Sequence, residues 1–247
     1  MSTVYDTSAE GSKDIITWEE SIASLLQEKM QTTRRRRQED SDAPFLVALV
    51  GIPGSGKSTS AHILSALLST RDIPNTIVPV DGYHYPLSTL QSFPKAQDVI
   101  YRRGAPDTFD TSLLVRDLDL ILHSKETFVS IPGFNHDVGD PEPNSHAFDR
   151  KSHQLILCEG LYLLHDDHGW EDLPPFDFSI YIHSDIDKAV ERLKVRNQCI
   201  PGYTVEEIKE RCEAVDRVNA VLVEKSKEFA DCIVESAAPT SIVLTIQ

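Results

Sequence analysis

Beyond residue 43, short apolar runs alternate with longer segments in which apolar residues recur at helical spacing. The apolar runs predict strands at residues 45–50, 76–80, 128–131, 155–158, 178–182, 232–234 and 242–246. The intervening segments predict helices at residues 59–69, 111–123, 185–197 and 205–227. The run at 45–50 is almost entirely apolar, as expected of a strand with both faces covered. This alternation predicts an α/β fold with a mostly parallel sheet of five or more strands and helices on both faces.

The first 43 residues have a different composition. Their apolar residues at helical spacing are Trp18, Ile22, Leu25, Leu26 and Met30. Thr17 and Glu20 precede this pattern as a capping box, which predicts an amphipathic helix. The arginine run at 34–37 could be a localisation signal or a phosphate patch, but the acids that follow it favour a solvated linker. We therefore expect residues 1–43 to form a helical extension with a basic linker, and residues 44–247 to form one domain.

Charge and composition limit the classes of partner. The chain carries 24 Lys and Arg against 39 Asp and Glu, a formal net charge of −15, which argues against general binding to nucleic acids or anionic membranes. No apolar run approaches the roughly 18–20 residues of a membrane-spanning helix. The four cysteines are scattered and the N-terminus is polar, so we expect a cytoplasmic protein with neither nucleic-acid nor membrane partners. The oligomeric state, including a homodimer, is left open.

A glycine-rich loop follows the first predicted strand. Its sequence, Gly-Ile-Pro-Gly-Ser-Gly-Lys-Ser at 51–58, has the Walker A spacing, in which backbone N–H groups surround phosphate oxygens, the lysine meets the β- and γ-phosphates and the serine hydroxyl binds Mg²⁺. The residues expected to hold the nucleotide are Gly51, Pro53, Gly54, Ser55, Gly56, Lys57, Ser58 and Thr59. The guanine-reading sequence Asn-Lys-x-Asp is missing from the chain, which argues against a GTPase. ATP and Mg²⁺ are the expected cofactors.

Two acids stand at the ends of predicted strands. Glu159 follows the strand at 155–158, and Asp81 follows the strand at 76–80. Since the carboxyl ends of parallel strands share one edge of the sheet, both acids should lie near the phosphate loop. Glu159 can bind Mg²⁺ together with Ser58, and Asp81 can orient and deprotonate an attacking hydroxyl. Taken alone, the dipeptide at 81–82 is more typical of an ordinary turn.

Four blocks of sequence carry a family resemblance. They are Asp-Gly-Tyr-His-Tyr-Pro at 81–86, Arg-Arg-Gly-Ala-Pro-Asp-Thr-Phe-Asp at 102–110, Ile-Pro-Gly-Phe-Asn-His at 131–136 and Leu-Ile-Leu-Cys-Glu-Gly-Leu at 155–161. In this order and over about residues 44–235, the chain resembles the phosphoribulokinase/uridine kinase/bacterial-type pantothenate kinase family. The resemblance implies a P-loop NTPase fold with a small lid at about 197–204.

The resemblance also implies roles for single residues. It makes Asp81 the catalytic base and places Glu159 near Mg²⁺ and the acceptor. The residues it assigns to acceptor binding are Tyr83, His84, Arg102, Asp107, Phe134 and His136. Asp110 remains an alternative to Asp107, and simple packing remains an alternative for the aromatic residues at 83–85.

The segment 184–196 resembles the strand-to-lid helix of uridine kinases. Arg192 and Arg196 are four residues apart, so they share one helix face and can present two guanidinium groups to the transferring phosphoryl group. The alternative is that they pair with neighbouring acids such as Glu191. Together with Lys57, Asp81 and Glu159, they complete the expected catalytic set.

The resemblance has gaps, which leave the acceptor open. The block at 131–136 is closer to pantothenate kinases, whereas 184–196 is closer to uridine kinases. The segment 137–150 has no counterpart and is expected to be a loop, and 215–220 resembles stretches of less-characterised members, with helix packing as its default role. The expected function is an ATP-dependent kinase for a hydroxyl of a nucleoside-like or a pantothenate-like metabolite. The alternatives are a nucleotide-binding regulatory protein and an ATPase coupled to a partner through the N-terminal helix.

Overall fold

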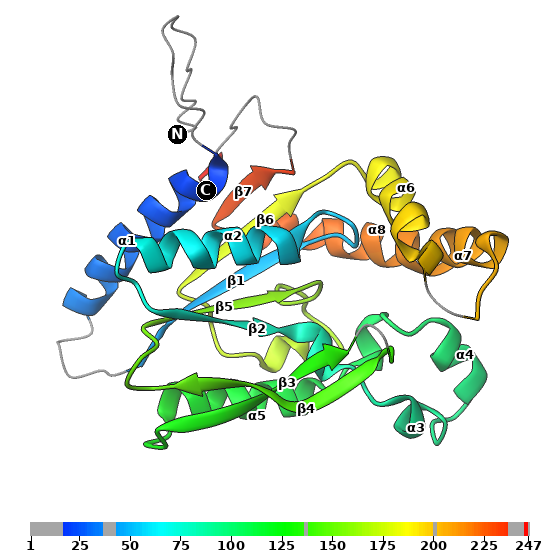
Figure 1. Ribbon diagram of the computed structural model, residues 1–247, viewed down its shortest axis with the longest axis horizontal. Helices are drawn as coiled ribbons and strands as arrows, with labels where there is room; N and C mark the ends of the chain where they lie inside the picture. Colours follow the sequence, from blue (N-terminus) through cyan, green and yellow to red (C-terminus); the bar gives the residue numbers. More distant parts are fainter. Residues whose placement is uncertain (1–16, 37–42, 136–137, 200–201, 237–244, 247) are drawn as a thin grey trace, which may run out of the picture.

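The computed structural model describes residues 17–36, 43–135, 138–199, 202–236 and 245–246, and its centre is a six-stranded sheet (Figure 1). In spatial order its strands are β2 (Asn75–Pro79), β5 (Leu155–Gly160), β1 (Phe45–Gly51), β6 (Phe178–His183), β7 (Cys232–Glu235) and β8 (Thr245–Ile246). The first five run parallel, and β8 pairs antiparallel with β7. The prediction of a mostly parallel α/β sheet is confirmed. From β1 the chain first adds β2 and β5 on one side and later β6 and β7 on the other. Such a reversal of strand order is a topological switch point, and it creates a crevice at the carboxyl ends of the strands.

Alternate side chains of β1 enter two different cores, because successive residues of a strand point to opposite faces. Phe45, Val47 and Leu49 join one cluster, and Leu46, Ala48 and Val50 join the other. The first core is covered by α1 (Trp18–Arg36) and α2 (Lys57–Thr70). The second is covered by α5 (Thr111–His123), α8 (Arg217–Lys225) and a β-hairpin. Helices therefore cover both faces, as predicted.

The N-terminal helix belongs to the first of these cores. Its capping box is present, with Thr17 N donating to Glu20 Oε2 at 3.0 Å and Glu20 N donating to Thr17 Oγ1 at 3.3 Å. Trp18, Ile22 and Leu26 are buried against α2 and the sheet. The predicted amphipathic helix is thus confirmed, and it continues to Arg36. No helix among the described residues combines the length and apolar character that crossing a membrane requires.

The hairpin corrects one expectation. β3 (Phe128–Asn135) pairs antiparallel with β4 (Asp140–Asp149) in a separate two-stranded sheet. The prediction of a loop over 137–150 is therefore wrong for most of this segment. Most side chains of β4 are exposed, so the strand lacks the apolar alternation by which strands are detected, and its two prolines are tolerated at an edge.

The C-terminal helical region is also divided. The predicted helix at 205–227 forms α7 (Val205–Arg211), a π-helical turn at Cys212–Asp216 and then α8. The helix predicted at 185–197 is α6 (Ile186–Arg196). The predicted lid at about 197–204 includes residues 200 and 201, which lie outside the described residues. Two short helices, α3 (Leu87–Leu90) and α4 (Ala96–Tyr101), have no counterpart in the predicted elements.

Candidate functional site

The glycine-rich loop connects β1 to α2 at the carboxyl edge of the sheet. Gly54 and Gly56 have φ angles of 77° and 92°, a left-handed conformation that glycine adopts without strain. A Cβ on Gly54 would lie 2.6 Å from the carbonyl oxygen of Ala189, so the missing side chain lets α6 pack directly on the loop. No side chain caps the first turn of α2. Its N–H groups and the positive end of the helix dipole are therefore suited to an anion.

Lys57 lies buried beneath this loop. Its Nζ donates to the carbonyl oxygen of Ile52 at 3.2 Å. Burial lowers the pKa of Lys57, while the negative charges of Glu159 and Asp81 oppose that shift and Arg196 adds to it. The ammonium group is thus close enough to interact with both predicted acids and with one predicted arginine. An ammonium has three donors, so a bound phosphate could replace or join the Ile52 carbonyl.

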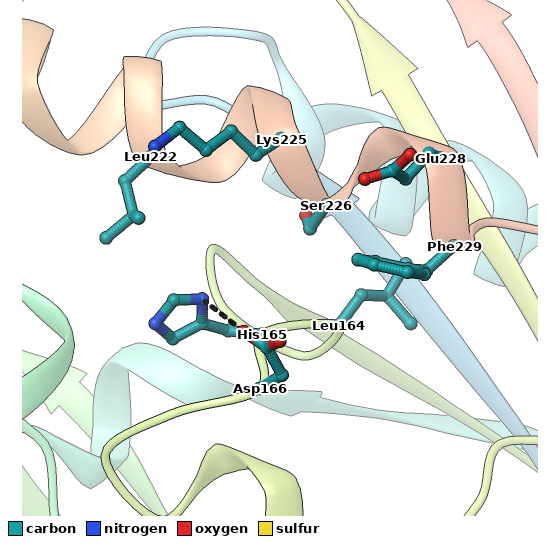
Figure 2. A pocket seen from close by; sticks show the side chains of 8 residues that line it. All are labelled: Leu164, His165, Asp166, Leu222, Lys225, Ser226, Glu228 and Phe229. Atoms are coloured by element: carbon teal, nitrogen blue, oxygen red, sulfur yellow. Dashed lines mark ion pairs between the residues drawn. The ribbon is translucent and has the colours of Figure 1, made fainter.

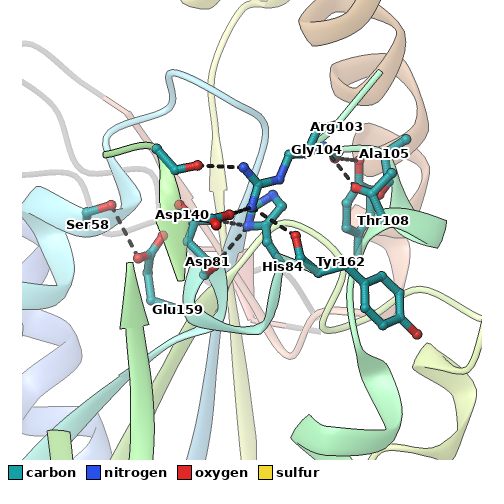
Figure 3. Close-up of polar contacts among 12 residues, drawn as sticks. Ser58, Asp81, His84, Arg103, Gly104, Ala105, Thr108, Asp140, Glu159 and Tyr162 are labelled. Atoms are coloured by element: carbon teal, nitrogen blue, oxygen red, sulfur yellow. Dashed lines mark hydrogen bonds and ion pairs between the residues drawn. The ribbon is translucent and has the colours of Figure 1, made fainter. Parts of the chain in front are cut away.

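Glu159 and Ser58 form the candidate magnesium site. Glu159 is the last residue but one of β5 and lies in register with Leu49 of β1 and Pro79 of β2. Ser58 Oγ donates to Glu159 Oε2 at 3.2 Å (Figure 3). Burial raises the pKa of Glu159 to about 6, with Lys57 opposing and Asp81 reinforcing the shift. Two oxygens about 3 Å apart can share one octahedral Mg²⁺, which usually takes one or two protein ligands and leaves its other positions to water and phosphate. This pair fits such a cation.

Asp81 stands in the 3-10 turn Val80–Tyr83 that follows β2, and 49% of its side chain is exposed. Gly82 fixes this turn against β3, since a Cβ there would lie 2.5 Å from the carbonyl oxygen of Pro132. His84 Nδ1 lies 2.8 Å from the Asp81 carbonyl oxygen and 4.0 Å from its Oδ1. Burial lowers the pKa of His84, although Asp81 opposes that shift. A largely uncharged imidazole therefore borders an accessible carboxylate (Figure 3).

Phe109, Phe134 and Arg103 lie around His84, and we call the surface formed by these four side chains the wall. The His84 ring lies 3.9 Å from the Phe109 ring and 5.4 Å from the Phe134 ring, measured between centroids. The Arg103 guanidinium lies 5.7 Å from the Phe134 centroid and donates to Asp140 Oδ1 at 2.6 Å. Two of the residues predicted to bind the acceptor, His84 and Phe134, thus lie together on this wall.

Other predicted acceptor residues are distributed differently. Arg102 and Asp107 bind each other through two hydrogen bonds, and this pairing lowers the pKa of Asp107. Asp110 instead caps α5, where it accepts a hydrogen bond from Leu113 N at 2.9 Å. Tyr83 is buried in the core, and its hydroxyl donates to the buried Asp117 at 3.1 Å. Its position therefore matches the alternative of simple packing. His136 lies outside the described residues.

The two predicted arginines of α6 have different partners. Arg192 donates to Ser184 Oγ, and Arg196 Nε donates to Asn197 Oδ1 at 3.1 Å. Arg196 also contributes to lowering the pKa of Lys57, which places it within electrostatic range of the phosphate loop. The structure therefore joins Lys57, Asp81, Glu159 and Arg196 electrostatically.

Sequence reasoning missed two residues of this region, Asp140 and Ser236. Arg103 belongs to the block at 102–110 that carries the family resemblance, and the structure shows that it binds Asp140, which comes from the strand that had been expected as a loop. Ser236, just after β7, donates from its hydroxyl to the carbonyl oxygen of Ser55 at 2.8 Å and so supports the phosphate loop. Since neighbouring arginines look alike in a sequence and Ser236 is 181 residues from Ser55, only the fold could identify these contacts.

A separate pocket of about 300 Å³ lies where the chain after β5 meets the end of α8 (Figure 2). Its lining residues are Leu164, His165, Asp166, Leu222, Lys225, Ser226, Glu228 and Phe229. None of them belongs to the phosphate loop or to the wall around His84. The candidate site therefore rests on the chemistry at the sheet edge, not on this pocket.

Comparison with known proteins agrees with this arrangement. The family model described as "Phosphoribulokinase / Uridine kinase family" matches residues 46–243, which include the phosphate loop and both strand-end acids. The chain belongs to the phosphoribulokinase/uridine kinase family. It therefore has the fold of a P-loop kinase, and the family implies ATP binding.

Individual proteins that resemble this chain differ in how much of it they match. A protein of Schizosaccharomyces pombe named "Putative uridine kinase" is 32% identical over 197 residues, covering 77% of this chain and 82% of its own length. A pantothenate kinase of Streptococcus pneumoniae is 30% identical over 157 residues, or 61% of this chain, and this chain spans 48% of its length. The crystal structure of a "putative fructose transport system kinase" from Silicibacter sp. TM1040 superposes with a TM-score of 0.72 at 28% identity, covering 85% of this chain and 95% of the other.

Proposed function

We propose that this protein is an ATP-dependent kinase that transfers the γ-phosphate of ATP to a hydroxyl of a small metabolite. The acceptor that we place first is nucleoside-like, and a pantothenate-like acceptor comes second. The observation that carries the proposal is the arrangement of the phosphate loop, Asp81 and Glu159 at the carboxyl ends of neighbouring strands, with both acids within electrostatic range of Lys57. A protein that only binds nucleotide has no evident need for an accessible carboxylate on the acceptor side of its phosphate loop.

The phosphate side has a separate role for each group. Backbone N–H groups of the loop would surround the phosphate oxygens, and Lys57 would offset the negative charge at the β- and γ-phosphates. Ser58 and Glu159 would hold Mg²⁺, which when bound supplies further positive charge to the phosphates. Arg196 would approach the transferring group from α6, and Arg192 would join it by leaving Ser184. Catalysis of this kind depends mainly on positioning and electrostatics.

The acceptor side centres on Asp81. Its carboxylate would accept a hydrogen bond from the attacking hydroxyl and take its proton as the phosphoryl group is transferred. The aromatic surface of His84 and Phe134 would pack on the body of the acceptor. The Arg102–Asp107 pair would offer charged groups for hydrogen bonds to the acceptor.

Two further assignments go with this proposal. We place the kinase site within residues 44–247, with residues 1–43 as an extension of that unit. We also propose a cytoplasmic location, which is supported by the buried free thiols of Cys158, Cys212 and Cys232.

The test is acceptor-stimulated release of ADP from ATP, measured with uridine, pantothenate and fructose as probes. Asp81→Asn should lower kcat with the active probe by about 100- to 10,000-fold, as loss of a general base does, and leave ATP binding nearly unchanged. Asp119→Asn, at an exposed position of α5, is the matched control and should retain full turnover. Unchanged turnover in the Asp81 variant would remove Asp81 as the base. Tight ATP binding without stimulation by any hydroxyl compound would instead favour a regulatory nucleotide binder.

A further inference from the structure

The π-helical turn between α7 and α8 sets the position of Asp216. The turn spans Cys212–Asp216, and it buries Cys212 and Val215 while leaving Asp216 partly buried at its end. A π turn is rare in proteins and, where it interrupts an α-helix, is found frequently at functional sites. Regular α-helix through residues 205–227 would point residue 216 in a different direction.

The Asp216 carboxylate has one oxygen without a partner. Its Oδ2 is buried and receives no hydrogen bond in the described structure, while the Cys212 thiol is within hydrogen-bonding reach of the carboxylate. Buried polar atoms in proteins nearly always have a partner, so this oxygen calls for a donor. Because rotation about χ2 of an aspartate is broad and two-fold, it exchanges the two oxygens easily. The unpaired oxygen can therefore turn toward a ligand.

Asp216 lies within electrostatic range of the proposed acceptor side. Burial raises the pKa of Tyr162, and the charges of Asp216, Asp107 and Asp81 raise it further, so all three carboxylates lie within electrostatic range of one tyrosine. The Tyr162 hydroxyl donates to the carbonyl oxygen of Gly104 at 2.8 Å (Figure 3). Arg196 provides a second connection, since it acts on the pKa of both Lys57 and Asp216.

One hydrogen bond and one close approach place α7 and α8 beside this region. Arg211, about one turn before Asp216, donates to the carbonyl oxygen of Arg103 at 3.0 Å. Beyond the turn, Asn219 of α8 lies near Gly104, because a Cβ added to Gly104 would lie 3.7 Å from the Asn219 side-chain amide. The π turn therefore lies next to the segment that carries Arg103 and Asp107.

We propose that Asp216 is an acceptor-binding residue whose carboxylate accepts a hydrogen bond from a hydroxyl that does not react. This inference rests on the proposed kinase function. A carboxylate accepts hydrogen bonds but repels other carboxylates, and here Asp216 stands with Asp81 and Asp107. The site therefore favours an acceptor with at least two hydroxyl groups and disfavours one that places a carboxylate beside Asp216.

The test compares Asp216→Asn with a control on the same turn. Glu213→Gln is suitable because Glu213 is exposed and pairs with Lys194 and Arg217. KM for the active probe among uridine, pantothenate and fructose should rise about 10- to 100-fold in Asp216→Asn, as expected for the loss of a hydrogen bond to a charged group. KM for ATP should stay within about twofold, and Glu213→Gln should change neither constant. A derivative of the probe that lacks one non-reacting hydroxyl should lose affinity for the wild type and lose little more for the variant.

Each outcome separates the two proposals. An active wild type whose acceptor KM is unchanged by Asp216→Asn would overturn this inference and leave the kinase function standing. A wild type without acceptor-stimulated turnover would overturn the kinase function, and this inference with it. ATP binding and thermal unfolding of Asp216→Asn are measured in parallel. If Asp216 served only to pack the fold, its substitution would lower both the affinity for ATP and the unfolding temperature, whereas loss of acceptor binding alone would leave them unchanged.

Discussion

At the scale of single residues, Glu159 is subject to opposing demands. It is half-buried between β1 and β2, where an ionised carboxylate is costly, yet it lies next to Lys57 and Ser58, where ionisation serves cation binding. Burial dominates in the protein without ligand and raises the pKa to about 6. The residue is therefore partly protonated in mildly acidic solution, and a bound cation would favour its ionised form.

This raised pKa predicts a stability difference that depends on pH. Because the folded protein holds the Glu159 proton more tightly than the unfolded chain, the wild type loses stability as pH rises from about 4.5 to about 6. Glu159→Gln avoids this loss, so it should be more stable than the wild type by about 2 kcal/mol at pH 7.5 and equally stable at pH 4.5. Urea unfolding at the two pH values measures the difference. The exposed Glu126→Gln is the control, and an equal effect of Glu159→Gln at both pH values would contradict the prediction.

At the scale of elements, the phosphate loop and α6 form one unit at Gly54. The helix approaches so closely that no Cβ fits between its backbone and the loop. This contact connects the element that carries Arg192 and Arg196 directly to the loop proposed to bind phosphate. A shift of α6 would therefore disturb both parts of the site.

Gly54→Ala tests this contact. It combines a left-handed φ with a clash against the Ala189 carbonyl, whereas Gly139→Ala has a similar φ of 73° and no heavy atom within 4 Å of the new Cβ. We expect Gly139→Ala to lower the free energy of unfolding by about 1–2 kcal/mol and Gly54→Ala by about 1–3 kcal/mol more. Chemical denaturation measures both values. Equal losses in the two variants would show that α6 does not press on the loop.

At the scale of the whole molecule, α1 is a structural part of the domain. Its apolar face joins β1, β6 and α2 in one of the two cores. Arg34, near its end, donates to Gln154 Oε1 at 2.8 Å, just before β5. Part of the arginine run predicted as a solvated linker therefore ends this helix, while Arg37 lies outside the described residues.

Truncation of one buried leucine measures how much this packing contributes. Leu26 is fully buried, whereas its neighbour Leu25 only borders the same core. Leu26→Ala should lower the free energy of unfolding by about 2–5 kcal/mol, as buried leucines do elsewhere, and Leu25→Ala should cost clearly less. Thermal and urea unfolding of the two variants provide the comparison. A loss below that of Leu25→Ala would mean that α1 contributes little to the stability of the domain.

The main features of fold and phosphate loop could be predicted because they depend on local chemistry. A buried strand must be apolar, a phosphate loop needs glycines and a lysine at fixed spacing, and an acid that ends a parallel strand reaches the edge where that loop lies. The strands at 45–50 and 155–158, the loop between residues 51 and 58, and the positions of Asp81 and Glu159 could therefore be derived from the residues alone.

The acceptor side depended on tertiary structure because packing sets the direction of each side chain. Arg102 and Arg103 are equivalent in the chain, but the fold pairs one with Asp107 and directs the other to Asp140 on a strand without an apolar pattern. Tyr83 is buried with its hydroxyl on Asp117, and the π turn ends at Asp216, whose charge acts on Tyr162. Such contacts join residues distant in the chain, and no local pattern encodes which of several similar side chains will make them.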